Sequence, residues 1–248
     1  MKFNKTIGDK RMSAFAKYRH VCYGDTSLSG IIAAEITLLL CNGLPGAAGL
    51  WLRGKLYRRL FASIGKGVVF GRNMTLRHPH KIHLGNNVVL DDNVVLDAKG
   101  DHNLGIRIGD DVYIGRNTIV YCKDGDIVIG SKANISSNCQ LFSSNRLEVG
   151  GGAVVGAFSY FLSGGEYDSA SAIPFADQDV QPSQGPLVIG ANSWIGAHVT
   201  VTDASSIGEH CVVGAGAVVT RPVPPNSVAV GVPARVVKSL SAAKPTHE

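Results

Sequence analysis

The chain has 248 residues, of which 45% are apolar and 17% are charged, so it can bury a sizeable core and is not disordered over most of its length. Glycine is abundant, at 30 residues, which indicates a fold that turns often. The formal net charge of +5 is too small by itself to indicate a nucleic-acid partner, and we predict none; it is compatible with a polyanionic ligand or an anionic membrane surface.

Residues 1–63 are predicted to form a helical N-terminal segment. The stretch 27–41, SLSGIIAAEITLLLC, is typical of a buried or surface helix, and the stretch 44–61 mixes aromatic and aliphatic residues with arginine and lysine. Two compatible interpretations remain open for this segment. It either caps one end of the domain that follows, or lies as an interfacial helix on an anionic membrane.

No membrane-spanning helix or signal peptide is expected. The first eleven residues, MKFNKTIGDKR, are polar, which does not fit a signal peptide. The longest apolar stretch, Ile31 to Cys41, is interrupted by Glu35 and is much shorter than the ~20 residues that a transmembrane helix needs. The five cysteines contain no CxxC pair, so we predict reduced, mostly buried thiols in a reducing compartment, the cytoplasm.

From about residue 64 onward, an aliphatic residue recurs every six positions and is usually followed by a small or polar residue. The hexads LGNNVV at 84, IGDDVY at 108 and IGANSW at 189 illustrate the pattern. A period of six fits neither one long strand, with its period of two, nor a helix, with its period of 3.6. It predicts coils of three short strands each, with the aliphatic residue pointing into a narrow shaft and a small residue at each tight corner.

The coil starts can be located in the sequence at positions 64, 84, 108, 129, 149, 189 and 207. An unbroken coil of three hexads has 18 residues, whereas 40 residues separate 149 from 189, so a long insertion lies between the fifth and sixth coils. We therefore predict a repeat domain over 64–237 with a protruding loop at 163–187, and a flexible tail at 238–248. Insertions in such repeat proteins often lie on the binding face.

Two stretches carry a resemblance to a known family. Residues 194–237, WIGAHVTVTDASSIGEHCVVGAGAVVTRPVPPNSVAVGVPARVV, resemble the C-terminal signature of the hexapeptide-repeat acyltransferases. Residues 71–130 are similar to the branch of that family that acts on sugars and cell-surface polysaccharides. The resemblance implies an all-β fold, a left-handed parallel β-helix of about seven coils behind the helical N-terminal segment. The handedness comes from the family alone, because ordinary crossovers between parallel strands are right-handed.

The resemblance also implies a donor site. In that family acyl-coenzyme A, here acetyl-CoA, lies in the groove between neighbouring prisms of a homotrimer, and no metal is needed. Small residues would let the pantetheine arm approach the backbone, and arginines would bind its phosphates. Carried over by position, the donor-binding residues are Trp194, Ala197, Ala215, Thr220, Arg221 and Arg235. The alternatives are that the alanines serve only the tight corners, that the arginines are merely solvated, and that Trp194 is a packing residue.

At the expected catalytic turn this chain departs from the family. The family commonly places a general-base histidine in a Gly-Gly-acid-His-Asp turn at the start of the large loop, whereas this chain has Gly-Gly-Glu166-Tyr167-Asp168. An unperturbed tyrosine has a pKa of about 10, so roughly one in a thousand is ionised at pH 7. Three alternatives follow. Tyr167 orients the acceptor while Glu166 or Asp168 acts as the base, a histidine from elsewhere replaces it, or the chemistry is lost.

Two polar residues before the loop are candidates for binding the acceptor, Asn138 and Ser143 in ISSNCQLFSSN. For Asn138 the alternative is a structural asparagine at a turn. Among the histidines, His198 and His210 occupy the fourth hexad position and are expected at the surface. His78, His80 and His83 crowd together in an expected turn, and we predict no zinc site there.

These observations predict an acyl-CoA-dependent O-acetyltransferase that acts on a sugar hydroxyl in surface polysaccharide biosynthesis. The alternative within enzymes is an N-acetyltransferase on an amino-sugar nucleotide, because a free amine needs less help from a base. The alternative outside enzymes is a catalytically weak homologue that serves as a scaffold in glycan assembly. Expected partners are two further copies of the chain, a sugar or polysaccharide acceptor, and the inner face of a membrane contacted by the N-terminal segment.

Overall fold

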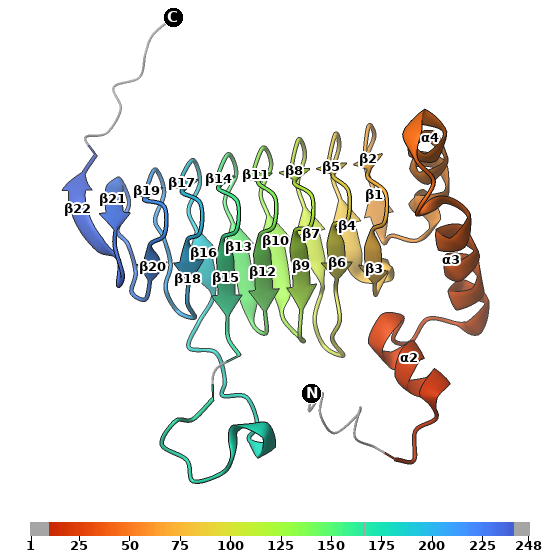
Figure 1. Cartoon of the computed structure of the whole chain (residues 1–248), viewed down its shortest axis with the longest axis horizontal. Helices are drawn as coiled ribbons and strands as arrows, with labels where there is room; N and C mark the ends of the chain where they lie inside the picture. Colours follow the sequence, from red (N-terminus) through yellow and green to blue (C-terminus); the bar gives the residue numbers. More distant parts are fainter. Residues whose placement is uncertain (1–9, 166, 241–248) are drawn as a thin grey trace, which may run out of the picture.

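Three parallel β-sheets wrap around one axis and form a prism, capped at one end by helices (Figure 1). The computed structural model describes residues 10–165 and 167–240. The first sheet contains β1 (Ser63–Ile64), β4 (Ile82–Leu84), β7 (Ile106–Ile108), β10 (Asp126–Ile129), β13 (Arg146–Val149) and β16 (Leu187–Ile189). The second contains β2 (Val69–Phe70), β5 (Val89–Leu90), β8 (Tyr113–Ile114), β11 (Asn134–Ile135), β14 (Val154–Val155), β17 (Trp194–Ile195), β19 (Val212–Val213), β21 (Ser227–Val230) and β22 (Arg235–Ser239). The third contains β3 (Thr75–Arg77), β6 (Val95–Asp97), β9 (Ile119–Cys122), β12 (Gln140–Ser143), β15 (Tyr160–Ser163), β18 (Thr200–Val201) and β20 (Val218–Val219).

The register of the first sheet matches the predicted coil starts. The residues at 64, 84, 108, 129, 149 and 189 pair with one another in that order, and an isolated bridge joins Ile189 to Ile207. The expected parallel β-helix of about seven coils is therefore confirmed. A further bridge from Ile207 to Val223 begins an eighth, incomplete coil that the hexads did not reveal.

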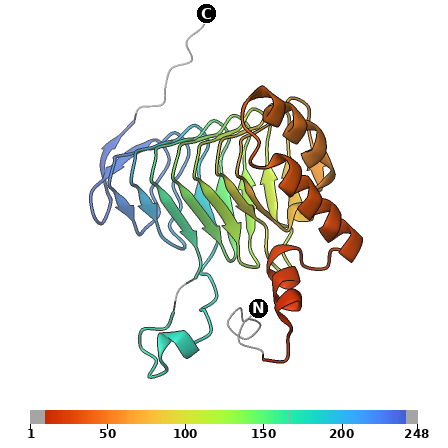
Figure 2. The same cartoon turned by 45° about the vertical axis from the view of Figure 1, so that its right-hand side comes forward.

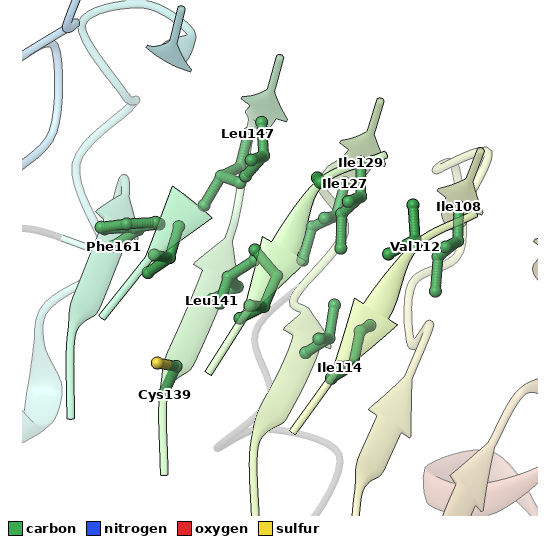
Figure 3. Close-up of a cluster of buried hydrophobic side chains, with 14 of the residues drawn as sticks. Ile108, Val112, Ile114, Ile127, Ile129, Cys139, Leu141, Leu147 and Phe161 are labelled. Carbon is green, nitrogen blue, oxygen red and sulfur yellow. The ribbon is translucent and has the colours of Figure 1, made fainter. Parts of the chain in front are cut away.

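The aliphatic hexad residues fill the shaft between the three sheets. Figure 3 shows part of this core, and the labelled side chains are all buried: Ile108, Val112, Ile114, Ile127, Ile129, Cys139, Leu141, Leu147 and Phe161. Because each coil adds one such layer, burial of apolar surface rises in step with coil number and holds the repeats together. The cysteines are free and four of the five are buried, as predicted.

The corners between strands use left-handed backbone, which asparagine tolerates better than most residues. Asn93, Asn117 and Asn138 have φ of 60°, 59° and 59° and stack on successive coils. The Nδ2 of Asn93 donates to Asn117 Oδ1 at 3.1 Å, and the Nδ2 of Asn117 donates to Asn138 Oδ1 at 3.1 Å. The position two residues before Asn117 must be small: a Cβ on Gly115 would lie 2.7 Å from the carbonyl carbon of Ser136.

Helices stand at the β1–β3 end of the prism, as Figures 1 and 2 both show. They are α2 (Ala14–Cys22), α3 (Leu28–Cys41), α4 (Gly46–Leu56) and the short 3₁₀ turn η1 (Tyr57–Arg59). The side chains of Ser13 and Ser27 cap the N-termini of α2 and α3 by accepting from backbone N–H groups. None of the helices within residues 10–165 and 167–240 is both long and apolar enough to cross a membrane.

The helices cover the open end of the core, as the cap interpretation predicts. Cys41, Tyr57 and Phe61 are buried in the same cluster as the shaft residues, and Tyr57 packs edge-on against Phe70 at 5.2 Å. Arg53 is buried at 4% exposure, and its guanidinium donates to the backbone carbonyls of Phe70, Cys41 and Leu44 at 3.0, 3.0 and 2.7 Å. This one side chain thus ties α3, α4 and β2 together.

The long insertion leaves the prism where predicted. It runs from Gly164 to Pro186 between β15 and β16, contains the 3₁₀ turn η3 (Phe175–Asp177), and protrudes from one edge of the prism (Figures 1 and 2). At the far end, β22 folds back antiparallel on β21 and continues to Ser239. The ordered domain therefore ends two residues beyond the predicted limit at 237, and residues 241–248 of the predicted tail lie outside the described residues.

Candidate functional site

Three alanines stack at one corner of the prism, between the second and third sheets. The backbone N–H of His198 donates to the carbonyl of Ala157 at 2.9 Å, and that of Gly216 donates to the carbonyl of Ala197 at 2.8 Å. Ala157, Ala197 and Ala215 therefore follow one another on three successive coils, and we call this stack the donor corner. The structure thus brings together the predicted residues Ala197 and Ala215, and it adds Ala157, which the sequence analysis missed.

An aromatic pair adjoins the donor corner. The rings of Phe158 and His198 stack with their centroids 4.9 Å apart and their planes at 4°. Both residues follow an alanine of the stack and have left-handed backbone, with φ of 62° and 58°. Trp194 is 60% exposed on β17, three residues before Ala197. The corner is therefore a smooth strip of small residues with aromatic rings beside it, which suits a thin flexible ligand.

Arg235 belongs to the same corner at its C-terminal end. It pairs with Val230 across β21 and β22, and the preceding Ala234 donates its N–H to Val218 O at 2.8 Å. Its side chain is exposed. Thr220 and Arg221 are also exposed, but they follow β20 and lie at the next corner, across the third sheet. Within one chain, then, only Arg235 of the two predicted arginines lies in line with the alanine stack.

The predicted catalytic turn lies at the start of the large loop. Tyr167 is 44% exposed and its ring lies 6.0 Å from that of Phe175. The carboxylate of Asp168 accepts a hydrogen bond from the N–H of Ala170 at 2.9 Å. The side chain of Gln178 holds the backbone of Asp168 with two hydrogen bonds: its Oε1 accepts from the N–H of Asp168, and its Nε2 donates to the carbonyl of Asp168. Glu166 lies outside the described residues. Because the loop leaves from the end of β15, the third sheet separates Tyr167 from the donor corner of the same chain.

The two predicted acceptor residues do not lie together. Asn138 sits at the corner between the second and third sheets, where its left-handed backbone and its bond from Asn117 fit the alternative of a structural turn. Ser143 is at the opposite end of β12 and is 0% exposed. Within the described part of the chain, its buried Oγ has no hydrogen-bond partner. Ser143 therefore presents no surface to an acceptor in the isolated chain.

The structure reveals a cleft that the sequence analysis missed, on the outer face of the third sheet. It has a volume of about 410 Å³ and is lined by Thr75, Arg77, Val95, Asp97, Ile119, Tyr121 and Gln140. We call it the third-sheet cleft. Arg77, Asp97 and Tyr121 are in register on three adjacent strands. Polar residues directly after the buried aliphatic residue in three successive coils were the available signal.

The crowded histidines of 78–83 have separate partners. His78 is buried with its Nε2 3.2 Å from the carbonyl of His20, His80 lies 3.3 Å from the hydroxyl of Thr26, and His83 lies 2.9 Å from that of Ser63. Among residues 10–165 and 167–240, no His, Cys, Asp or Glu side chains form a group that could hold a metal ion. These histidines therefore hold α2, η2 (Pro79–Lys81) and β1 in place.

Comparisons with known protein families agree with this architecture. Residues 186–221 match the model of the bacterial transferase hexapeptide (six repeats), and residues 62–98 match the hexapeptide repeat of succinyl-transferase. Both matched models describe hexapeptide-repeat transferases, to which these two stretches of the chain are similar. The two matches lie toward the two ends of the prism, and the strands of the three sheets run continuously between them.

Curated relatives share parts of this hexapeptide-repeat domain. The galactoside O-acetyltransferase of Escherichia coli (strain K12) is 48% identical over 56 residues, which cover 23% of this chain and 28% of that protein. A Mycobacterium tuberculosis protein named Probable acetyltransferase Rv3034c is 31% identical over 134 residues, covering 54% of this chain and 44% of that protein. The chain thus spans less than half the length of these relatives.

Solved structures share the fold over most of the prism. A mutant of AntD, an N-acyltransferase from Bacillus cereus in complex with dTDP and coenzyme A, is 25% identical, has a TM-score of 0.53, and is matched over 77% of this chain and 90% of that chain. The polySia-specific acetyltransferase NeuO is 20% identical with a TM-score of 0.54, over 75% and 85% of the two chains. The second likeness shows the fold alone.

Proposed function

We propose that the protein is an acyl-CoA-dependent O-acetyltransferase that uses acetyl-CoA to acetylate a sugar hydroxyl in surface polysaccharide biosynthesis. The observation that carries the proposal is the stack of Ala157, Ala197 and Ala215 in line with Arg235. Three small residues on successive coils let a pantetheine arm run parallel to the axis against the backbone. The guanidinium at the end of that line would bind the phosphates through charge-assisted hydrogen bonds.

The reaction needs few groups from the protein. The acceptor oxygen attacks the thioester carbonyl carbon, the carbon–sulfur bond breaks, and the acceptor proton ends on the departing coenzyme A. Much of the acceleration would come from holding donor and acceptor in a shared groove. The base stays a prediction: Tyr167 orients the acceptor while Asp168 or Glu166 takes the proton, or a histidine does so.

The separation of the loop from the donor corner supports a homotrimer. In one chain the third sheet lies between Tyr167 and the alanine stack, so a site that uses both must take one from a neighbouring prism. Thr220 and Arg221 are also separated from the alanine stack by the third sheet. A donor site that uses them must therefore take them from a neighbouring prism as well. The flat faces of the prism are suited to such packing.

An N-acetyltransferase acting on an amino-sugar nucleotide is the second candidate. It is favoured by the tyrosine at the usual histidine position, since a neutral amine attacks a thioester with less help from a base. The similarity to AntD, which is named an N-acyltransferase, supports it as well. The third candidate, a catalytically weak scaffold, would bind coenzyme A without transferring the acyl group.

We also propose that the helical cap rests on an anionic membrane surface. The outer side of α3 is apolar: Leu28, Ile32, Ile36, Leu39 and Leu40 are exposed, Leu39 at 85%. They recur at three- and four-residue spacing and so lie on one side of the helix. Glu35, the acidic residue of α3, is engaged by the hydroxyls of Tyr18 and Tyr23.

Charge favours lipid over a second copy of the cap. Residues 1–63 contain ten lysines and arginines against three acids, whereas residues 64–248 contain 14 against 16. Lys55, Arg58 and Arg59 are all exposed in α4 and η1. Two caps meeting face to face would bring like charges together, whereas anionic headgroups complement them.

The donor corner can be tested with two matched tryptophan variants. Ala197 and Ala191 lie in the same coil, each directly before a corner residue with left-handed backbone, but at different corners. In an assay of coenzyme A release from acetyl-CoA with a panel of sugars and amino sugars, we expect Ala197→Trp to raise the KM for acetyl-CoA at least tenfold, because the indole fills the strip. Ala191→Trp should leave it within twofold. Equal effects, or no release with any acceptor, would contradict the proposal.

A further inference from the structure

The third-sheet cleft lies beside the proposed path of the donor. Gln140, at one end of the cleft, begins β12 directly after the corner that contains Asn138. That corner continues the donor corner by one coil, since the N–H of Phe158 donates to the carbonyl of Ser137 at 3.1 Å. An arm that runs from Arg235 past the alanines therefore points toward the cleft, with coils spaced by about 4.8 Å.

The floor of the cleft holds a buried carboxylate in a fixed orientation. The side chain of Asp97 is 8% exposed, and its Oδ2 lies 3.5 Å from Nη1 of Arg77. Its other oxygen accepts from the backbone N–H of Lys99 at 3.1 Å. A carboxylate that is held in one orientation and partly removed from water is suited to accepting hydrogen bonds from sugar hydroxyls.

Cations outnumber acids around this floor. Lys99 lies within electrostatic reach of Arg77, Lys123 and Asp97. Burial lowers the pKa of Lys99, and Asp97 opposes that shift. Asp124, which follows Lys123, accepts with its carboxylate from the backbone N–H groups of Asp101 and His102 at 2.8 Å. Beside the lining pair Arg77 and Asp97, Lys99 and Lys123 therefore add positive charge, which an anionic group would neutralise.

One wall of the cleft is aromatic. The ring of Tyr121 packs against Phe142 with centroids 4.8 Å apart, and Phe142 is buried. Burial and the neighbouring Tyr160 raise the pKa of Tyr121, so its hydroxyl stays protonated and can donate a hydrogen bond. A rigid ring beside polar groups offers a sugar both an apolar face and directed hydrogen bonds.

We propose that the third-sheet cleft is the acceptor site, and that it binds a sugar carrying an anionic group, a phosphate or a carboxylate. Arg77 and Lys123 meet the anionic group, Asp97 and Gln140 bind hydroxyls, and Tyr121 lies against the ring. The proposal rests on the proposed acyl transfer for its role, but the binding of an anionic sugar does not depend on it. None of its residues belongs to the C-terminal signature. All but Gln140 lie within 71–130, but the resemblance of that stretch indicated a branch of the family and no acceptor residue.

Binding of three sugars by isothermal titration calorimetry tests the proposal on the full chain. The probes are glucose 1-phosphate, glucuronate and methyl glucoside, which differ mainly in the anionic group. We expect at least one anionic sugar to bind at least tenfold more tightly than methyl glucoside, and to weaken as salt rises from 50 to 300 mM (about a threefold or greater loss). The stronger of the two identifies phosphate or carboxylate as the group recognised. Equal binding of all three sugars, or binding of none, would overturn the proposal.

Two matched arginine variants locate the binding site. Arg77 in β3, the edge strand of the third sheet, and Arg107 in β7 both point outward from their sheets, but Arg107 belongs to the first sheet, away from the cleft. We expect Arg77→Gln to lower affinity for the preferred anionic sugar at least tenfold, and Arg107→Gln to change it less than twofold. Arg77→Gln removes the ion pair of Asp97 and leaves it with the N–H of Lys99 and the ring of His78, 3.9 Å away, so this variant is expected to lose stability. Lys123→Gln therefore serves as a second variant, with at least a threefold loss of affinity expected. If a folded Arg77→Gln or Lys123→Gln variant binds the preferred anionic sugar with the same affinity as Arg107→Gln, the site lies elsewhere.

Titration of the same variants with coenzyme A separates this inference from the proposed function. We expect Arg77→Gln and Lys123→Gln to bind coenzyme A as the unchanged chain does, within twofold. Failure of every form to bind coenzyme A would contradict acyl transfer while leaving the sugar result intact. A loss of coenzyme A affinity that parallels the loss of sugar affinity would instead place the donor, and not the acceptor, in the cleft.

Discussion

At the scale of single residues, the prism contains a natural internal control. His198 and His210 both occupy the fourth hexad position, and their backbones have nearly the same left-handed φ, 58° and 54°. They lie at different corners, His198 at the donor corner and stacked on Phe158, and His210 at the corner after Ile207. Any difference between variants of the two therefore reports on the corner and not on the backbone.

We predict that His198→Ala raises the KM for acetyl-CoA by about three- to tenfold, because the stacked pair is worth roughly 1 kcal/mol to a ligand lying against it. His210→Ala should change it by less than twofold. Both should lose some thermal stability, because histidine tolerates left-handed backbone better than alanine does. The loss should be larger for His198→Ala, which also removes the stack on Phe158. Steady-state kinetics and melting curves check this, and a shared effect on KM would remove His198 from the site.

Residue positions were predictable where the hexad alone decides them. Leu141 and Phe161 are buried because the hexad places them in the shaft, and Ala197 and Ala215 stack because the corner repeats with each coil. The burial of Ser143 was not predicted because β12 continues beyond the hexad pattern to four residues. Side chains alternate between the two faces of a strand, so Ser143 points inward with Leu141.

At the scale of elements, the buried arginine of α4 joins the helices to the prism. Arg53 satisfies three backbone carbonyls that come from β2, α3 and the turn before α4. Removing the guanidinium would leave these buried carbonyls without hydrogen-bond donors. Each buried acceptor left unsatisfied typically lowers the free energy of unfolding by about 1–3 kcal/mol. The cap is thus more sensitive to this residue than to its exposed basic neighbours.

Arg53→Met is therefore expected to lower the free energy of unfolding by about 3 kcal/mol or more, measured in urea. Lys55→Met, two residues away on the same helix and exposed, should change it by no more than about 0.5 kcal/mol. Similar losses in both variants would indicate that helix propensity, and not the three carbonyl contacts, holds the cap.

The apolar side of α3 gives a second prediction at this scale. Ile36→Glu should weaken sedimentation with vesicles containing anionic phosphatidylglycerol at least fivefold, because it places a charge at the interface. Leu104→Glu serves as the control, since Leu104 is also exposed but lies in the insertion between β6 and β7. Raising salt should weaken binding of the unchanged chain. Equal binding to neutral and anionic vesicles, or no binding, would exclude this surface.

Two features escaped the sequence analysis for physical reasons. The N-terminal segment was predicted to be helical as a whole, but the bounds of α2 within it were not, because no residue of α2 is buried. The position of α2 depends on contacts such as the hydrogen bond from the N–H of His78 to Cys22 O. The third-sheet cleft is made by residues on adjacent coils that are about 20 to 24 positions apart. Their proximity follows from the register of the coils, which insertions of differing length obscure.

At the scale of the whole molecule, the hexads sufficed to predict the prism but not how prisms associate. Each coil buries its own aliphatic residues, so the pattern is local and repeats visibly. Association depends on which outer faces meet, and outward positions carry no period. The division of the candidate site between two corners of one chain is therefore the structural argument for a shared site.

Mixed assembly of two inactive variants tests that argument. Ala197→Trp should block the donor corner and Tyr167→Ala should disable the loop; each alone is expected to reduce activity at least tenfold. If every site combines the donor corner of one chain with the loop of the next, co-refolding the two variants in equal amounts leaves about a quarter of the sites intact, and activity returns to about that fraction. A site built within a single chain would gain nothing on mixing. Sedimentation velocity should show trimers in all samples, and a full activity of Tyr167→Ala alone would remove the loop tyrosine from the reaction.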